Sequence, residues 1–87
     1  MTETKQPTSD RVVFAKNLKR ARLIRGLSQD TLAYEAGVGR TFVSEVERGT
    51  RNLSIDNMSK LAAALSVPLR DLVDPDRFSD PLDADAK

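Results

Sequence analysis

The chain has 87 residues, a length that suits one small domain. It contains no cysteine and no histidine, which excludes disulfides, thiolate metal sites, thiol nucleophiles and the commonest general base. No apolar run approaches the roughly 18 residues of a membrane span, and residues 1–10 lack a signal-peptide core, so we expect a cytoplasmic protein.

The net charge of +1 conceals an uneven distribution along the chain. Residues 11–52 contain nine Lys or Arg and four acidic residues, a local charge of +5. Residues 71–87 contain six Asp against Arg77 and Lys87, a local charge of −4. A basic body with an acidic tail suits a polyanionic partner, although a solvated charged surface accounts for the charge equally well.

The first predicted helix spans Asp10–Arg25. The preceding residues 1–9 are polar and contain Pro7, so we expect a disordered arm that ends at Ser9, the cap of this helix. Gly26 ends the helix in a left-handed conformation. The apolar spacing predicts an inward face made of Val13, Phe14, Leu18, Ala21 and Leu23.

Four further helices follow, each with a local start signal. They are Gln29–Ala36 after Ser28, Arg40–Arg48 after Gly39, Ile55–Leu65 after Ser54, and Pro68–Val73. The inward residues of the fourth are Ile55, Met58, Leu61, Ala62 and Leu65. With no strand signal, the chain is predicted to be an all-α, compact five-helix domain over residues 10–74, followed by an acidic flexible tail over residues 75–87.

The most informative segment is QDTLAYEAGVGRTFVSEVER, residues 29–48. Ala33 stands where two helices come closest, and Gly37 stands in the turn, where a positive φ is expected. This pattern predicts a helix-turn-helix, which places its second helix in the DNA major groove. A plain helical bundle with the same turn is the alternative.

A longer stretch, Phe14–Leu72, resembles the lambda-repressor/Cro-type helix-turn-helix family, also called Xre. The most specific segments are RGLSQ, LAYEAGV, VERGTRNLS and LAAALSVPLRDL, and RTFVSEVERGTRNLS looks like the controller proteins of restriction-modification systems. The resemblance implies a lambda-repressor-like fold and a bacterial or phage-encoded transcription regulator. It also implies a homodimer that binds a pseudo-palindromic operator in double-stranded DNA, with no enzymatic activity, cofactor, metal or membrane partner.

The resemblance assigns the recognition residues by position. Base reading falls to Arg40, Thr41, Phe42 and Ser44, with Glu45 as a further candidate, and phosphate binding to Gln29, Arg48, Thr50, Arg51 and Asn52. Arg40 can hold guanine with two hydrogen bonds, worth about 1–3 kcal/mol of discrimination. The alternatives are packing onto the second helix for Phe42 and plain surface charge for the loop residues. Lys16, Lys19 and Arg20 either add long-range attraction or form a solvated helix face.

Two structural roles also come from the resemblance. Arg22 and Glu47 match a buried ion pair of the family, which removes both from the DNA-binding set. A dimer interface is implied at Leu65, Val67, Leu69, Leu72 and Val73, with a monomer core as the alternative.

The rival function is an Xre-like interaction module, such as an antitoxin, whose acidic tail Asp71–Asp85 binds a partner protein. An enzyme is the least supported class, because neither His nor Cys is present.

Overall fold

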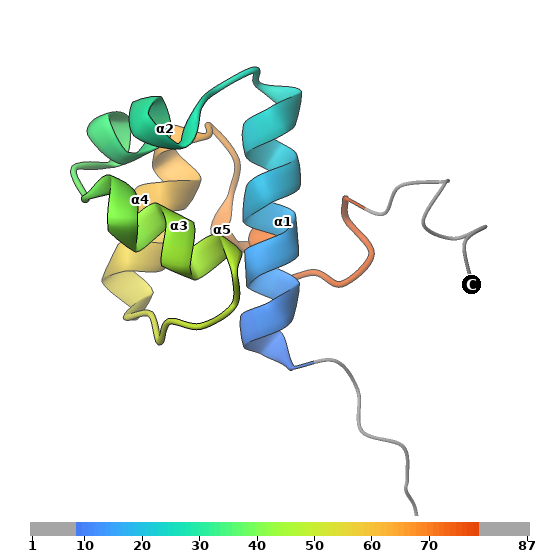
Figure 1. Ribbon diagram of the computed structural model, residues 1–87. Helices are drawn as coiled ribbons and strands as arrows, with labels where there is room; N and C mark the ends of the chain where they lie inside the picture. The colour runs from blue at the N-terminus through green and yellow to red at the C-terminus, as the bar shows by residue number, and fades with distance from the viewer. Residues whose placement is uncertain (1–8, 79–87) are drawn as a thin grey trace, which may run out of the picture.

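The computed structural model describes residues 9–78, and within them the chain forms five helices and no strand. The helices are α1 (Asp10–Ile24), α2 (Gln29–Ala36), α3 (Arg40–Glu47), α4 (Ile55–Ala64) and α5 (Leu69–Leu72). Figure 1 shows α2, α3 and α4 gathered on one side of the long α1. The predicted all-α, five-helix architecture is therefore confirmed.

Local capping explains why the helix starts were predictable. The Oγ atoms of Ser9, Ser28 and Ser54 accept hydrogen bonds from the backbone N–H groups of Val12, Thr31 and Asn57, at 3.3, 3.0 and 3.0 Å. The first, third, fourth and fifth helices end one residue earlier than predicted, because Arg25, Arg48, Leu65 and Val73 are C-caps. Pro68 is the N-cap of α5 rather than its first residue.

Left-handed backbone follows four of the helices, at Gly26, Gly37, Gly49 and Ser66. Gly37 closes α2 at φ 74°, a conformation that costs glycine nothing. Ser66 follows the end of α4 at φ 59°, where an L side chain is strained. The N–H groups of Ser66 and Val67 nevertheless complete the last turn by donating to Ala63 and Ala62 at 3.0 and 3.1 Å.

One apolar core joins all five helices. Its largest fully buried side chains are Phe14, Leu18, Leu32, Val43, Val46, Leu61, Leu65 and Leu72. Each buried leucine of this kind stabilises the fold by about 1.5–3 kcal/mol. The long α1 contributes Phe14 and Leu18, and the shorter helices close over them.

Two residues predicted to face inward are exposed. Leu23 is 56% exposed, because it lies two positions beyond Ala21 and so on another side of α1. Ile55 is 63% exposed, because it is the first residue of α4 and the helix reaches the core only from Met58 onward. The prediction is wrong for both.

A buried asparagine fixes the end of the domain. The Asn17 side chain is 5% exposed, and its Nδ2 donates to the carbonyls of Asp71, Leu72 and Asp74 at 3.3, 3.1 and 2.8 Å. These bonds satisfy carbonyls that α5 leaves unpaired at its C-terminal end. Because the donor is on α1, they attach the last helix to the first.

The chain continues in an ordered turn along α1. Arg20 Nη1 donates to the carbonyl of Phe78 at 2.8 Å, and Arg77 pairs with Asp71 at 3.3 Å. The proposed arm up to residue 8 and the part of the proposed tail from residue 79 lie outside the described residues. The boundary between domain and tail stays a prediction.

Candidate nucleic-acid interface

A tight turn sets the angle between α2 and α3. The N–H of Gly37 donates to the carbonyl of Tyr34 at 3.2 Å, and that of Val38 donates to Ala33 at 2.9 Å. Ala33 is 3% exposed, which leaves no room for a larger side chain between the helices. Since Val43 and Val46 of α3 are buried as well, the opposite side of α3 is directed to solvent.

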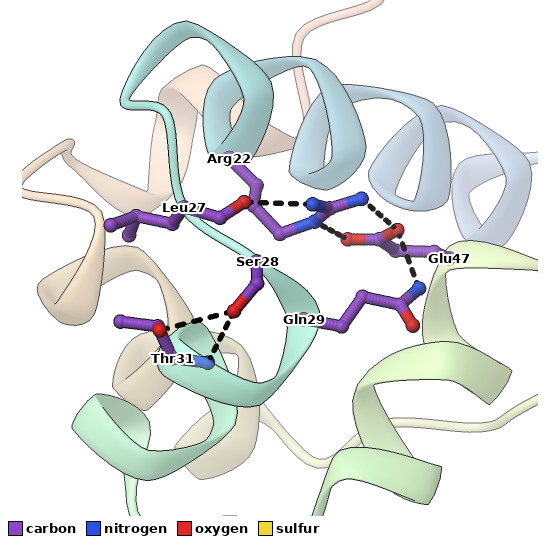
Figure 2. Close-up of polar contacts among 6 residues, drawn as sticks. All are labelled: Arg22, Leu27, Ser28, Gln29, Thr31 and Glu47. Atoms are coloured by element: carbon purple, nitrogen blue, oxygen red, sulfur yellow. Dashed lines mark hydrogen bonds and ion pairs between the residues drawn. The ribbon is translucent and has the colours of Figure 1, made fainter.

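A buried ion pair holds the C-terminal end of α3 against α1. Figure 2 shows Arg22 Nε and Nη2 donating to the two carboxylate oxygens of Glu47, at 2.6 and 3.0 Å, while Nη1 donates to the carbonyl of Leu27 at 2.8 Å. The side chains of Arg22 and Glu47 are only 10% and 4% exposed. The structure thus brings together the two residues that the sequence resemblance paired, and their role is to orient α3.

The same carboxylate also receives a side chain from the start of α2. Gln29 Nε2 donates to Glu47 Oε1 at 3.1 Å, as Figure 2 shows. An amide nitrogen has two N–H groups, so the second remains for an external acceptor such as a phosphate. Gln29 therefore has a positioning contact that the sequence did not predict, and its phosphate role stays a prediction.

The first turn of α3 carries two exposed polar side chains, Arg40 and Thr41. Arg40 Nε lies 3.1 Å from Asp30 Oδ1, and these side chains are 65% and 73% exposed. An ion pair this exposed contributes little stability and opens easily. Arg40 is thus tethered to α2 but can be released to another acceptor.

Phe42 has a different environment from its two neighbours. Its ring is half-buried and packs against the hydrophobic core. The guanidinium carbon of Arg51 lies 4.9 Å from the ring centroid, in cation–π contact. Phe42 therefore links the recognition helix to the loop after it.

Several other residues predicted to contact DNA form three local hydrogen bonds within the protein. Arg48 Nη1 donates to Ser44 Oγ at 2.8 Å along the exposed side of α3. Arg51 Nη1 donates to Glu45 Oε1 at 2.6 Å, and Thr50 Oγ1 donates to the Glu45 carbonyl at 3.2 Å. Glu45 thus orients Arg51 and Thr50 within the loop, which gives this acidic residue a structural reason to stand near basic ones.

Sequence reasoning missed one arginine at this surface. Arg11 Nη2 of α1 donates to Asn52 Oδ1 in the loop that follows α3. The two residues are 41 positions apart, so no local pattern could have indicated the contact. Among the other basic residues of α1, Lys16 and Lys19 are exposed and Arg20 is half-buried.

The predicted dimer residues separate into two groups. Leu65 and Leu72 are 1% and 0% exposed, so they belong to the core of the protomer and offer no surface to a partner. Their assignment to an interface is wrong for that reason. Val67 and Leu69 are half-buried, and Val73 is 42% exposed.

A hollow of about 520 Å³ lies beside the exposed Val73. Its apolar walls are Phe14, Leu53, Met58 and Val73, and its polar rim is formed by Asp10, Arg11, Arg51 and Asn52. Exposed Ile55 stands three residues before Met58, on the same side of α4. Exposed apolar side chains therefore lie near this hollow, at Ile55 and Val73, and also on α1 and α2, at Leu23, Ile24 and Tyr34.

Among residues 9–78, no three His, Cys, Asp or Glu side chains are grouped so that they could hold a metal ion. None of the helices in the described part of the chain is long and apolar enough to cross a membrane.

The two short helices α2 and α3 are joined by a glycine turn, and the second begins with the exposed Arg40 and Thr41. These features define a helix-turn-helix domain. The family model for the helix-turn-helix matches residues 18–72, and the chain belongs to this family, of the Xre type.

Several relatives are controller proteins. Control protein C.BamHI from Bacillus amyloliquefaciens is 43% identical over 65 residues, covering 74% of this chain and 80% of the relative. The crystal structure of the restriction-modification controller protein C.AhdI from Aeromonas hydrophila has 46% identity and a TM-score of 0.71, covering 75% of this chain and 98% of that one. C.Esp1396I bound to a 25 base pair operator site has 31% identity and a TM-score of 0.66, covering 71% and 82%.

Proposed function

We propose that this protein is a sequence-specific DNA-binding transcription regulator of the controller type. The observation that carries the proposal is the exposed first turn of α3, with Arg40 and Thr41, on a helix fixed by the buried Arg22–Glu47 pair. Its structural relative C.Esp1396I, bound to a 25 base pair operator, supports the same use of the fold. The rigid placement of α3 matters because hydrogen bonds from its side chains to base edges tolerate little displacement of the helix.

In this proposal α3 enters the major groove and Arg40 reads a base. On binding, Arg40 exchanges the exposed carboxylate of Asp30 for the O6 and N7 acceptors of a guanine. Thr41 offers its hydroxyl and methyl groups one position further on, and Ser44 lies one turn later on the same helix. Phe42 acts through its exposed edge and through the arginine stacked on it.

The loop after α3 binds the DNA backbone. Arg48, Thr50, Arg51 and Asn52 are all exposed, and Arg51 is held in place by Glu45 and Phe42. Gln29, at the N-terminus of α2, adds its second amide N–H where the helix dipole also favours an anion. Such contacts position the protein on DNA and carry little sequence information.

The active species is a homodimer. A two-fold dimer would present two copies of α3 about 34 Å apart, which suits half-sites one helical turn apart. With Leu65 and Leu72 buried in the protomer, we assign the contact to the exposed Ile55 and Val73 together with the half-buried Val67 and Leu69. Burying these side chains also adds apolar area to a small core.

We propose that the protein binds DNA and catalyses no reaction, since helix-turn-helix regulators are not a class of enzyme. It places the protein in the cytoplasm, where a bacterial operator is accessible. Selection of bound duplexes from a random pool by the full chain tests the function. We expect enrichment of an inverted repeat with half-site centres about 10 base pairs apart. A pool without an enriched sequence would overturn the proposal.

A further inference from the structure

Arg11 connects two parts of the chain that are far apart in sequence. It lies in the first turn of α1, and its Nη2 donates to Asn52 Oδ1 in the loop between α3 and α4. Figure 1 shows that loop descending from α3 beside the N-terminal half of α1. The fold therefore places an arginine of α1 against the loop to which we assign phosphate binding.

Among the residues that the structure describes, no carboxylate forms an ion pair with Arg11. Within residues 9–78, Arg22, Arg40, Arg51 and Arg77 each form an ion pair with Asp or Glu. Arg11 instead bonds the neutral amide of Asn52, and the nearby Asp10 lines the same hollow without pairing to it among the described residues. A guanidinium has five N–H donors, so one bond to Asn52 leaves the others for an incoming anion.

Arg11 also shares a rim with Arg51. Both line the hollow beside the loop, and Asn52, which directly follows Arg51 in sequence, accepts a hydrogen bond from Arg11. Arg51 in turn stacks on Phe42, in the first turn of α3. Contacts thus run from Phe42 of α3 to Arg51, and from the adjacent Asn52 to Arg11 at the start of α1.

We propose that Arg11 is a DNA-backbone-binding residue, which holds a phosphate adjacent to the one bound by Arg51, with Asn52 as its positioning residue. The inference rests on the proposed function and extends it to a helix outside the helix-turn-helix. Forked guanidinium donors suit the paired oxygens of a phosphate. The contact is independent of base sequence, because phosphates are the same at every step.

The test compares Arg11→Gln with Lys16→Gln in the full chain. Both changes remove one positive charge from α1, but Lys16 is exposed five residues further on and forms no hydrogen bond or ion pair with the described residues of the loop. Affinities for the selected operator and for a scrambled duplex are measured by fluorescence anisotropy at several salt concentrations. Circular dichroism melting of each variant establishes that both remain folded.

We expect Arg11→Gln to weaken binding to both duplexes by a similar factor and to lower the slope of log affinity against log salt by about 1. Lys16→Gln should leave the slope unchanged. Arg11→Lys should recover most of the slope, since a lysine still binds phosphate. Equal slopes for Arg11→Gln and Lys16→Gln, with a wild type that binds its operator, would overturn the inference alone. A wild type that binds no duplex would overturn both this inference and the proposed function.

Discussion

Arg22 and Glu47 form a two-pronged ion pair between the middle of the domain's longest helix and the last residue of its recognition helix. All three guanidinium nitrogens of Arg22 donate hydrogen bonds, and Glu47 also accepts one from Gln29. A buried charge that is fully hydrogen-bonded fixes geometry well but adds little net stability. The pair therefore contributes mainly to the orientation of α3.

Single and double substitutions of Arg22 and Glu47 should have different effects on the free energy of unfolding. Arg22→Met or Glu47→Leu alone leaves a buried charge without its partner and should lower the free energy of unfolding by about 3–5 kcal/mol. The double variant should recover most of that loss, because no unpaired charge remains. Urea unfolding followed by circular dichroism measures all three. A double variant that loses the sum of the two single losses would contradict the proposed coupling.

The double variant also separates stability from function. Its α3 lacks the hydrogen bonds that fix the helix, so we expect weaker discrimination between operator and scrambled DNA than in the wild type, at equal folded fraction. Unchanged discrimination would show that packing of Val43 and Val46 alone orients the helix.

Ser66 offers a test of backbone strain that is independent of DNA. Ser66→Gly removes the cost of an L side chain at φ 59° and should raise the free energy of unfolding by about 0.5–1 kcal/mol. The control is Ser59→Gly, an exposed position inside α4, which should lose about 0.5 kcal/mol. Thermal melting compares the two. A destabilised Ser66→Gly variant would contradict the strain argument.

Arg40 and Arg51 should give opposite signatures in DNA binding. Arg40→Ala should cost about 1–3 kcal/mol on the operator and less on scrambled DNA, because it loses a base contact. Arg51→Ala should weaken binding to both alike and lower the salt slope by about 1, because it loses a phosphate contact. Anisotropy titrations at several salt concentrations distinguish them. Equal losses of Arg40→Ala on both duplexes would assign Arg40 to the backbone instead.

Asp30 is predicted to restrain Arg40 in the free protein. Asp30→Asn removes the exposed ion pair and should tighten operator binding several-fold, while stability changes by less than about 1 kcal/mol. Glu35→Gln is the control: it removes the same charge from the exposed surface of α2 and leaves Arg40 paired. Similar gains for both variants would mean that only the overall charge matters.

The features that could be predicted from the sequence are those that depend on residues close together in the chain. Ser9, Ser28 and Ser54 cap helices through bonds three residues away, and Gly37 ends α2 through its own backbone, so each helix could be placed to within a residue or so. Core positions with regular spacing followed in the same way. The predictions failed at Leu23, which lies on another side of α1 from Ala21, and at Ile55, the first residue of α4, before the helix reaches the core.

The parts that sequence reasoning missed involve distant partners. Asn17 bonds carbonyls more than 50 residues away, and Arg11 bonds Asn52 across 41 residues. Apolar character alone does not distinguish a core residue from a residue of a dimer interface. The fold places Leu65 and Leu72 inside the protomer. Arg22–Glu47 was an exception, because a family resemblance carries tertiary information that spacing does not.

Sequence specificity is the central claim, and its most direct measurement is a ratio of affinities. The full chain is titrated at about 0.15 M salt against the inverted repeat selected from random DNA and against a shuffled duplex of equal length and composition. The account predicts at least about a thousandfold tighter binding to the repeat, with two protein chains per duplex. A ratio near one would contradict it, because phosphate contacts alone bind every sequence equally.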